Sequence, residues 1–132
     1  MLEIFKEFTF EAAHHLVTSI DKEHPYARLH GHSFHVTVYL RGELSERTGW
    51  VTDFSSIDAA IRPLRNRLDH HYLNDIEGLD QPTLEILSQW IFERLSHELP
   101  LLHRVTVRRG SCGEGCSYEA MDNSSAVPDR NR

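Results

Sequence analysis

Two segments in which apolar and polar side chains alternate constrain the fold of this chain more than any other feature. In residues 2–13, Phe8, Phe10 and Ala12 alternate with acidic residues and a threonine, which is the period-two pattern of a half-buried β-strand. The second segment, HGHSFHVTVYLRGEL, begins at His30 and is rich in β-branched and aromatic residues. Because both segments are long, we expect a sheet built around two long strands.

The middle of the chain predicts two helices. From Ser55 onward apolar residues recur at helical spacing, with Ser55 and Asp58 as the expected N-terminal cap, and Pro63 should kink or shorten this helix. A second helix should begin after Thr83, a favourable N-cap residue, and end near Pro100.

Shorter strands complete the expected secondary structure. The stretch GELSERTGWVTDF, from Gly42, predicts a turn that leads into a short third strand. The stretch HRVTVRR, from His103, predicts a late strand, and a return strand is expected after the glycine-rich loop SCGEGCS.

The composition is that of an ordinary globular domain. Of the 132 residues, 39% are apolar and 26% are charged, so we expect one domain over residues 1–120 and a disordered polar tail over residues 121–132. The formal charge of −6 argues against nucleic-acid binding, and no apolar stretch is long enough to span a membrane. No secretory signal is visible, so we expect a cytoplasmic protein in which Cys112 and Cys116 are free thiols.

Three histidines can meet at the ends of the two long strands. His30 and His32 share one face of the second strand about 6–7 Å apart, and Gly31 leaves room between them. His14 ends the first strand with the parity of Phe10, so antiparallel pairing could bring it beside His30. Three imidazoles without a fourth protein ligand describe an open, catalytic type of zinc site. The alternative for H-x-H alone is a chance pair on a surface strand.

Five short motifs, taken together and in order, carry a family resemblance. They are F-x-A-A-H at Phe10 to His14, R-L-H-G-H-S-F at Arg28 to Phe34, G-W-V-x-D-F at Gly49 to Phe54, L-D-H-H-Y-L-N at Leu68 to Asn74, and P-T-x-E at Pro82 to Glu85. This series resembles the 6-pyruvoyl- and 6-carboxytetrahydropterin synthase family, especially its bacterial 6-carboxytetrahydropterin synthase branch. The resemblance extends from about Phe5 to Tyr118.

The resemblance implies an α+β tunnelling fold, a four-stranded antiparallel sheet with two helices on one face. Three such subunits would close a barrel, and two barrels would stack as a homohexamer with active sites between subunits. It also implies Zn2+ bound by His14, His30 and His32, and a pterin-like small molecule, 7,8-dihydroneopterin triphosphate, as substrate in the route to queuosine and other 7-deazapurines. Zinc would polarise the hydroxyls of the substrate side chain.

The proton-transfer groups match the family only in part. Asp69 and His70 match its Asp-His pair, in which a carboxylate fixes the tautomer of an imidazole and raises its basicity. The alternative is that Asp69 ends the first helix and His70 packs beneath the loop. Tyr26 stands four residues before His30, where the family has a cysteine base. Since only about one tyrosine in a thousand is ionised at pH 7, Tyr26 is either an altered catalytic residue or an aromatic wall of the pocket.

The expected substrate contacts also depart from the family pattern. Arg109 stands where the family has a glutamate that binds the pterin ring. A guanidinium only donates hydrogen bonds, so Arg109 is mismatched with the donor edge of a pterin and could instead bind an anion or an acceptor-rich ring. Glu114 could supply a replacement carboxylate, and the alternative for Arg109 is a solvated charge on an edge strand. Cys112 and Cys116 match loop cysteines of the carboxypterin branch and could offer a thiol.

Three functional hypotheses therefore stay open. The first is a zinc-dependent lyase of the 6-carboxytetrahydropterin synthase type, which the motifs favour. The second is an enzyme with the same zinc scaffold and a different substrate, and the third is a binding homologue without turnover. The residues that favour the last two are Tyr26 and Arg109.

Overall fold

The computed structural model describes residues 1–16 and 28–121. Tyr26 and the expected disordered tail, from residue 122 onward, lie outside the described residues. In chain order the elements are β1 (Leu2–His14), β2 (His30–Gly42), α1 (Phe54–Leu68), the short 3-10 helix η2 (Leu73–Asp75), α2 (Leu84–Ser96), β3 (Leu102–Arg109), the 3-10 helix η3 (Gly110–Cys112) and β4 (Glu114–Glu119). Within the described ranges, no helix has the length and hydrophobicity needed to span a membrane.

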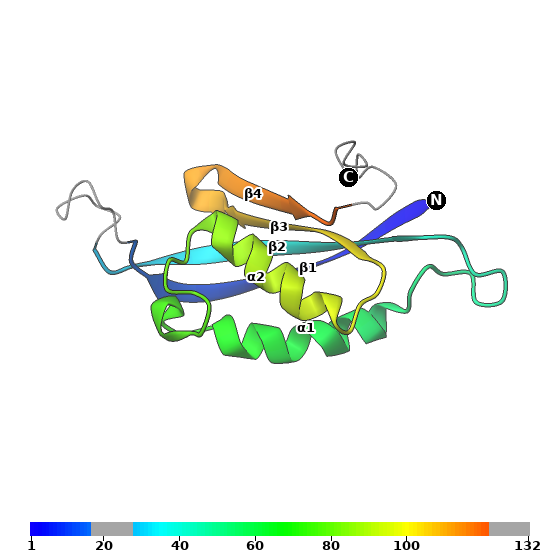
Figure 1. The fold of residues 1–132 in the computed structure, drawn as a ribbon, viewed down its shortest axis with the longest axis horizontal. Coiled ribbons are helices and arrows are strands. Elements are labelled where there is room, and N and C mark those ends of the chain that lie inside the picture. The colour runs from blue at the N-terminus through cyan, green and yellow to red at the C-terminus, as the bar shows by residue number, and fades with distance from the viewer. Residues whose placement is uncertain (17–27, 122–132) are drawn as a thin grey trace, which may run out of the picture.

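The four strands form one antiparallel sheet with two helices on one of its faces. The strand order is β1-β2-β3-β4, so each strand pairs with its neighbour in the sequence. Figure 1 shows α1 and α2 side by side on the same face of the sheet, with α1 against β1 and α2 against β3 and β4. The predicted α+β class, with a four-stranded antiparallel sheet and two helices on one face, is confirmed.

The alternation in β1 and β2 determines which face the helices cover. Phe10, Phe34 and Val36 are fully buried on that face, and Phe10 stacks on Phe34 with ring centroids 4.9 Å apart. Burying one large apolar side chain is worth roughly 1.5–3 kcal/mol. A one-residue slip would move the whole apolar set to the other face. The packed core therefore fixes the register, in which Phe10 pairs with Phe34 and His14 with His30.

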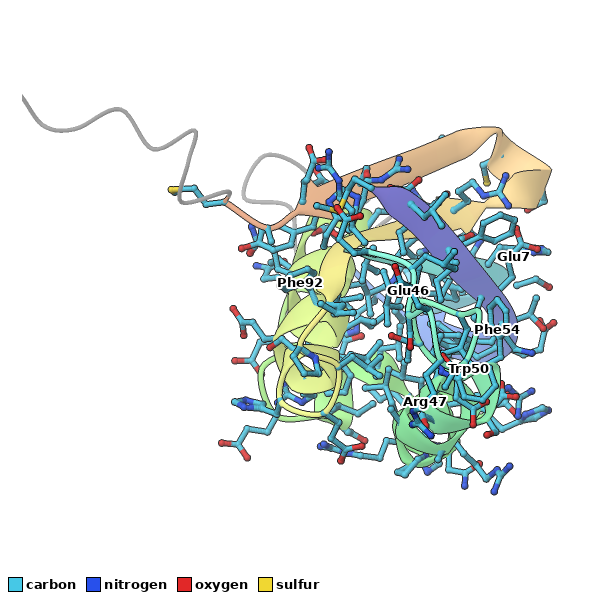
Figure 2. The ribbon with its side chains drawn as sticks, turned by 90° about the vertical axis from the view of Figure 1, so that its right-hand side faces the viewer. Glu7, Glu46, Arg47, Trp50, Phe54 and Phe92 are labelled. Carbon is cyan, nitrogen blue, oxygen red and sulfur yellow. The ribbon has the colours of Figure 1, made fainter. Side chains whose placement is uncertain are left out.

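The stretch from Gly42 to Phe54 was predicted to be a turn that leads into a short third strand, and the prediction of that strand is wrong. Residues 43–53 form turns, in which the Ser45 N–H donates to Trp50 O and the Gly49 N–H donates to Ser45 O. Gly49 has a φ of 79°, a left-handed conformation that glycine adopts without strain. Figure 2 shows Trp50 and Phe54 near each other in this region, and each residue is 48% exposed.

The helices differ from the expectation at one end of α1. Its N-cap is Asp53, whose side chain accepts from the Ser55 N–H, in place of the predicted pair of Ser55 and Asp58. Pro63 lies inside α1 and does not shorten it, because Pro63 is exposed and the apolar positions on either side of it are buried. Thr83 caps α2 as predicted, accepting from the Ile86 N–H.

Candidate metal centre

His14, His30 and His32 converge at the ends of β1 and β2. One nitrogen from each imidazole lies within 4.8 Å of the other two. The ring centroids are 4.6 Å apart for His14 and His30, 5.1 Å for His14 and His32, and 4.7 Å for His30 and His32. This arrangement can offer three nitrogens to a single ion and leaves a fourth position open. The predicted meeting of His14 with His30 through antiparallel pairing is confirmed.

Backbone carbonyls orient two of these rings. Nδ1 of His14 donates to Pro82 O at 3.0 Å, and Nδ1 of His30 donates to Arg28 O at 2.7 Å. Since a carbonyl only accepts, the lone pair of each ring lies on Nε2, as in metal-binding histidines. Nε2 of His14 is buried and has no hydrogen-bond partner among the described residues. A buried lone pair beside two further imidazoles fits a zinc ligand.

The surroundings keep two of the three imidazoles neutral. Burial lowers the pKa of His14 to about 4, although the hydrogen bond to Pro82 acts in the opposite direction. Burial and then the positive charge of Arg109 lower the pKa of His32, while Glu114 opposes this effect. Metal ions bind neutral imidazole, so both rings are in the binding form at pH 7 without having to lose a proton.

The motif L-D-H-H-Y-L-N lies along the outer edge of β1. The Glu11 N–H donates to the Asp69 carboxylate at 2.9 Å, and the His70 N–H donates to Glu11 O at 2.6 Å. The Asn74 side chain bonds both the N–H and the carbonyl of His15. These contacts hold the end of β1, and with it the histidine cluster, against the segment that follows α1.

Asp69 and His70 form a pair at this edge. Asp69 Oδ2 lies 2.9 Å from Nδ1 of His70, and the His70 side chain is 78% exposed. The hydrogen bond from the Glu11 N–H, followed by the one from His70, lowers the pKa of Asp69, so its carboxylate is ionised and can orient the ring. Asp69 also ends α1, as one alternative expected, but His70 does not pack beneath the loop. His70 has a φ of 59°, in the left-handed region.

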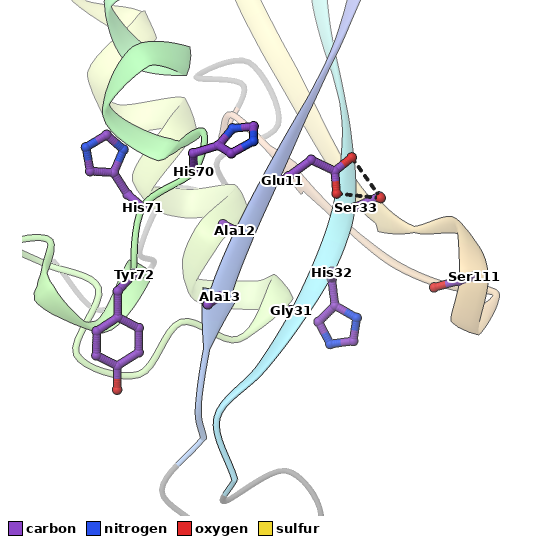
Figure 3. A pocket seen from close by; sticks show the side chains of 10 residues that line it. All are labelled: Glu11, Ala12, Ala13, Gly31, His32, Ser33, His70, His71, Tyr72 and Ser111. Carbon is purple, nitrogen blue, oxygen red and sulfur yellow. Dashed lines mark hydrogen bonds between the residues drawn. The ribbon is translucent and has the colours of Figure 1, made fainter.

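A groove of about 650 Å³ is lined by the segment after α1 and by the paired ends of β1 and β2. Figure 3 shows Glu11 and Ser33 between His70 on one side and Ser111 on the other. Ser33 donates to the Glu11 carboxylate, with distances of 2.9 and 2.7 Å to its two oxygens. Sequence reasoning treated Glu11 as a variable strand residue. The pairing of Glu11 with Ser33 in the strand register is the signal that brings them together.

Arg109 on β3 and Glu114 on β4 lie beside His32. They pair directly across β3 and β4, with Arg109 Nη2 2.8 Å from Glu114 Oε2. Nη1 of Arg109 is 3.5 Å from Nε2 of His32. Arg109 is only 8% exposed, so the alternative of a solvated charge on an edge strand is wrong. β3 is an inner strand because β4 pairs on its outer side.

The two cysteines contact serine side chains and not the histidine cluster. Cys112 is exposed in η3, and Cys116 is half-buried with its Sγ 3.5 Å from Oγ of Ser88 on α2. Both are free thiols, as the sequence predicted.

The fold and the three converging histidines define a small α+β domain with a candidate catalytic metal centre. A sequence profile of the 6-pyruvoyl tetrahydropterin synthase family matches residues 3–121. The chain belongs to this family.

Curated relatives extend this finding. A 6-carboxy-5,6,7,8-tetrahydropterin synthase of Synechocystis is 46% identical over 121 residues, which cover 87% of this chain and 91% of the relative. A dihydroneopterin monophosphate aldolase of Pyrococcus furiosus is 36% identical, over 83% of this chain and 87% of the relative.

Solved structures support the fold. The 6-pyruvoyl tetrahydropterin synthase of Caenorhabditis elegans superposes with a TM-score of 0.80 at 22% identity, over 91% of this chain and 96% of that one. The corresponding protein of Plasmodium vivax gives a TM-score of 0.73 at 20% identity, over 92% of this chain and 98% of that one.

Proposed function

We propose that this chain is a zinc-dependent lyase of the 6-carboxytetrahydropterin synthase type, acting on 7,8-dihydroneopterin triphosphate or a related pterin in the route to queuosine and other 7-deazapurines. The observation that carries the proposal is the convergence of three imidazole nitrogens within 4.8 Å. The 46% identity to the Synechocystis 6-carboxytetrahydropterin synthase supports the choice of reaction.

Three residues would hold the metal, namely His14, His30 and His32. When bound, zinc would act as a Lewis acid toward the oxygens of the substrate side chain. The Pro82 carbonyl keeps the His14 proton on Nδ1, and burial keeps the ring neutral, so this ligand needs no rearrangement to bind an ion. A preformed ligand set of this kind favours a fixed geometry for the bound molecule.

A proton would be moved by His70. Asp69 holds Nδ1 of His70, which leaves Nε2 as the atom that exchanges a proton with the substrate. The 78% exposure of this side chain leaves Nε2 accessible from outside the subunit. Tyr26, where the family has its base, is the third catalytic residue of the proposal, as an altered base or an aromatic wall.

The proposed assembly is a homohexamer of two stacked trimeric barrels. Within the described chain, β1 and β4 are the outer strands of the sheet. On β1 the backbone of Glu11 and Ala13 is already bonded to the segment after α1. Closure would therefore pair the earlier part of β1, and β4, with the outer strands of neighbouring subunits. The exposed His70 could then serve the metal centre of a neighbour.

A second candidate function is a reaction of the same zinc scaffold on a different substrate. The specific observation in its favour is the buried Arg109 beside His32, where a ring-binding carboxylate is expected. Glu114 supplies a carboxylate close by, but Arg109 engages it. The name of the Pyrococcus relative indicates that a pterin phosphate other than the triphosphate can be the substrate of a similar protein.

Product analysis by mass spectrometry tests the proposed function. The full-length protein is incubated separately with 7,8-dihydroneopterin triphosphate, the monophosphate and unphosphorylated dihydroneopterin. We expect 6-carboxytetrahydropterin and acetaldehyde from the triphosphate, and no product from a His30→Ala variant. His35→Ala, an exposed histidine on the opposite face of β2, is the matched control and should keep the activity. Turnover of the monophosphate alone would select the second candidate, and turnover of none by zinc-loaded protein would refute both.

A further inference from the structure

Arg109 places a buried positive charge next to the metal-binding nitrogens, and one of its hydrogen-bond donors is unused. Its side chain is 9% exposed, and its Nε is buried without a hydrogen-bond partner among the described residues. Nη1 faces His32 at 3.5 Å, and Nη2 faces the Glu114 carboxylate at 2.8 Å. Burying a guanidinium costs free energy unless its donors are used, so an incompletely used one indicates a missing acceptor.

The position of Arg109 identifies the kind of acceptor. Arg109 shares the buried, helix-covered face of the sheet with the three histidines, so a cation bound there and the guanidinium would repel each other. An anion that contacts both would remove this repulsion. The planar guanidinium binds two oxygens of a phosphate or a carboxylate side by side.

Glu114 already pairs with Arg109 through such a group, and it is the more exposed partner of the two. Its side chain is 46% exposed, against 9% for Arg109. It begins β4 directly after Gly113, whose φ of 68° marks the turn from η3. Moving Glu114 into water restores its hydration at little cost, whereas Arg109 cannot leave without exposing the interior.

We propose that Arg109 recognises an oxyanion, a phosphate or a carboxylate, on the molecule that binds at the histidines, and that Glu114 is the internal anion which this group displaces. The inference rests on the proposed function in placing the substrate at the histidine cluster. It adds a substrate class, because a pterin without an anionic group would leave Arg109 paired with Glu114. It also predicts that substitutions of Arg109 and Glu114 change anion affinity in opposite directions, whereas a purely structural ion pair would make the two substitutions equivalent.

Calorimetric titration of the purified full-length protein with inorganic phosphate, and separately with acetate, tests this inference. Arg109→Met should weaken binding of the preferred anion by about tenfold or more, since each factor of ten corresponds to one lost charge-assisted contact of ordinary strength. Glu114→Gln should strengthen the same binding by roughly threefold or more, because the competing carboxylate is gone. Arg108→Met is the matched control: this neighbour is exposed and equally charged, and its loss should leave the affinity unchanged.

A second readout reports on the site itself. The 15N–1H resonance of the Arg109 Nε group should shift when the anion binds, since this buried group gains an acceptor. Tighter binding of phosphate or of acetate identifies which oxyanion is recognised. The inference is overturned if wild type and Glu114→Gln bind neither anion, if Arg109→Met binds as well as wild type, or if Glu114→Gln weakens binding. The metal content decides whether the zinc assignment holds. Repeating the titration after chelation of metal then tests anion binding by Arg109 separately, so the two failures can be distinguished.

Discussion

The three-histidine cluster and the single His70, both near the end of the sheet, are built in different ways. His14, His30 and His32 belong to paired strands, and their nitrogens are brought together by the register that the core imposes. His70 belongs to the turn after α1, with a left-handed backbone and a side chain that is 78% exposed. The first group can form a complete three-ligand site within one chain. The second presents a single oriented imidazole outward, which suits a group that acts on a substrate held by other residues.

This difference separates holding an ion from moving a proton. A metal ligand gains from burial, which keeps the imidazole neutral and dry, as at His14. A proton-transfer group must exchange its proton with solvent between turnovers, which burial would slow. Substitutions at the two places should therefore change different observables.

The largest expected effect concerns turnover at His70. Replacing His70 by Ala should lower kcat by roughly 10²–10⁴-fold, the usual loss for a positioned acid or base. Zinc content should stay at the wild-type level, because His70 is not part of the three-histidine cluster. Stopped-flow or product-formation kinetics beside metal analysis checks this. A His70→Ala variant that loses zinc together with activity would contradict the separation of metal binding from proton transfer.

An intermediate effect is expected on the pH dependence of stability in metal-free protein. The pKa of His14 is lowered to about 4 in the folded chain, against 6.5 ordinarily, which corresponds to about 3 kcal/mol. Since the unfolded chain binds the proton more readily, this contribution is fully present above pH 6.5. It is lost as the pH falls from 6.5 to 4.

Urea unfolding in a chelator at a series of pH values measures this effect. His14→Gln should remove the corresponding slope, so the two unfolding free energies should converge as the pH falls. His71→Gln is the control, because His71 is exposed, and it should keep the wild-type slope. Equal slopes for wild type and His14→Gln would show that His14 is not held neutral by burial.

The smallest effect separates the backbone of residue 70 from its imidazole. His70→Ala and His70→Gly both remove the ring, but only glycine adopts a φ of 59° without strain. We expect the Gly variant to be more stable than the Ala variant by about 1 kcal/mol. Thermal or urea unfolding checks the difference, and both variants should be equally impaired in turnover. A more stable Ala variant would show that the left-handed conformation is not retained.

The histidine cluster could be predicted from the sequence because it follows from side-chain parity along two strands and from their antiparallel pairing. Alternation puts His14 on the face of Phe10, and His30 and His32 on the face of Phe34, so one antiparallel pairing brings them together. The orienting carbonyl of Pro82 could not be predicted, because it comes from the loop before α2, far away in the chain.

The alternative that Arg109 is a solvated charge was wrong because of side-chain parity. Arg109 shares the helix-covered face of β3 with Val105 and Val107 and is buried, whereas Arg108 lies on the opposite face and is exposed.

The absent third strand has a local reason. Trp50 and Val51 favour a strand by propensity, but the turn at Gly49 and the cap at Asp53 leave too few residues between them to form one.

The zinc content of matched variants tests the central claim most directly. Wild type and His35→Ala, after dialysis against zinc and then buffer, should each contain about one zinc per chain, bound through nitrogens at about 2.0–2.1 Å in X-ray absorption. His30→Ala should retain less than about a tenth of that, because two imidazoles make an inadequate site. Full zinc content in His30→Ala, or none in wild type, would contradict the three-histidine centre.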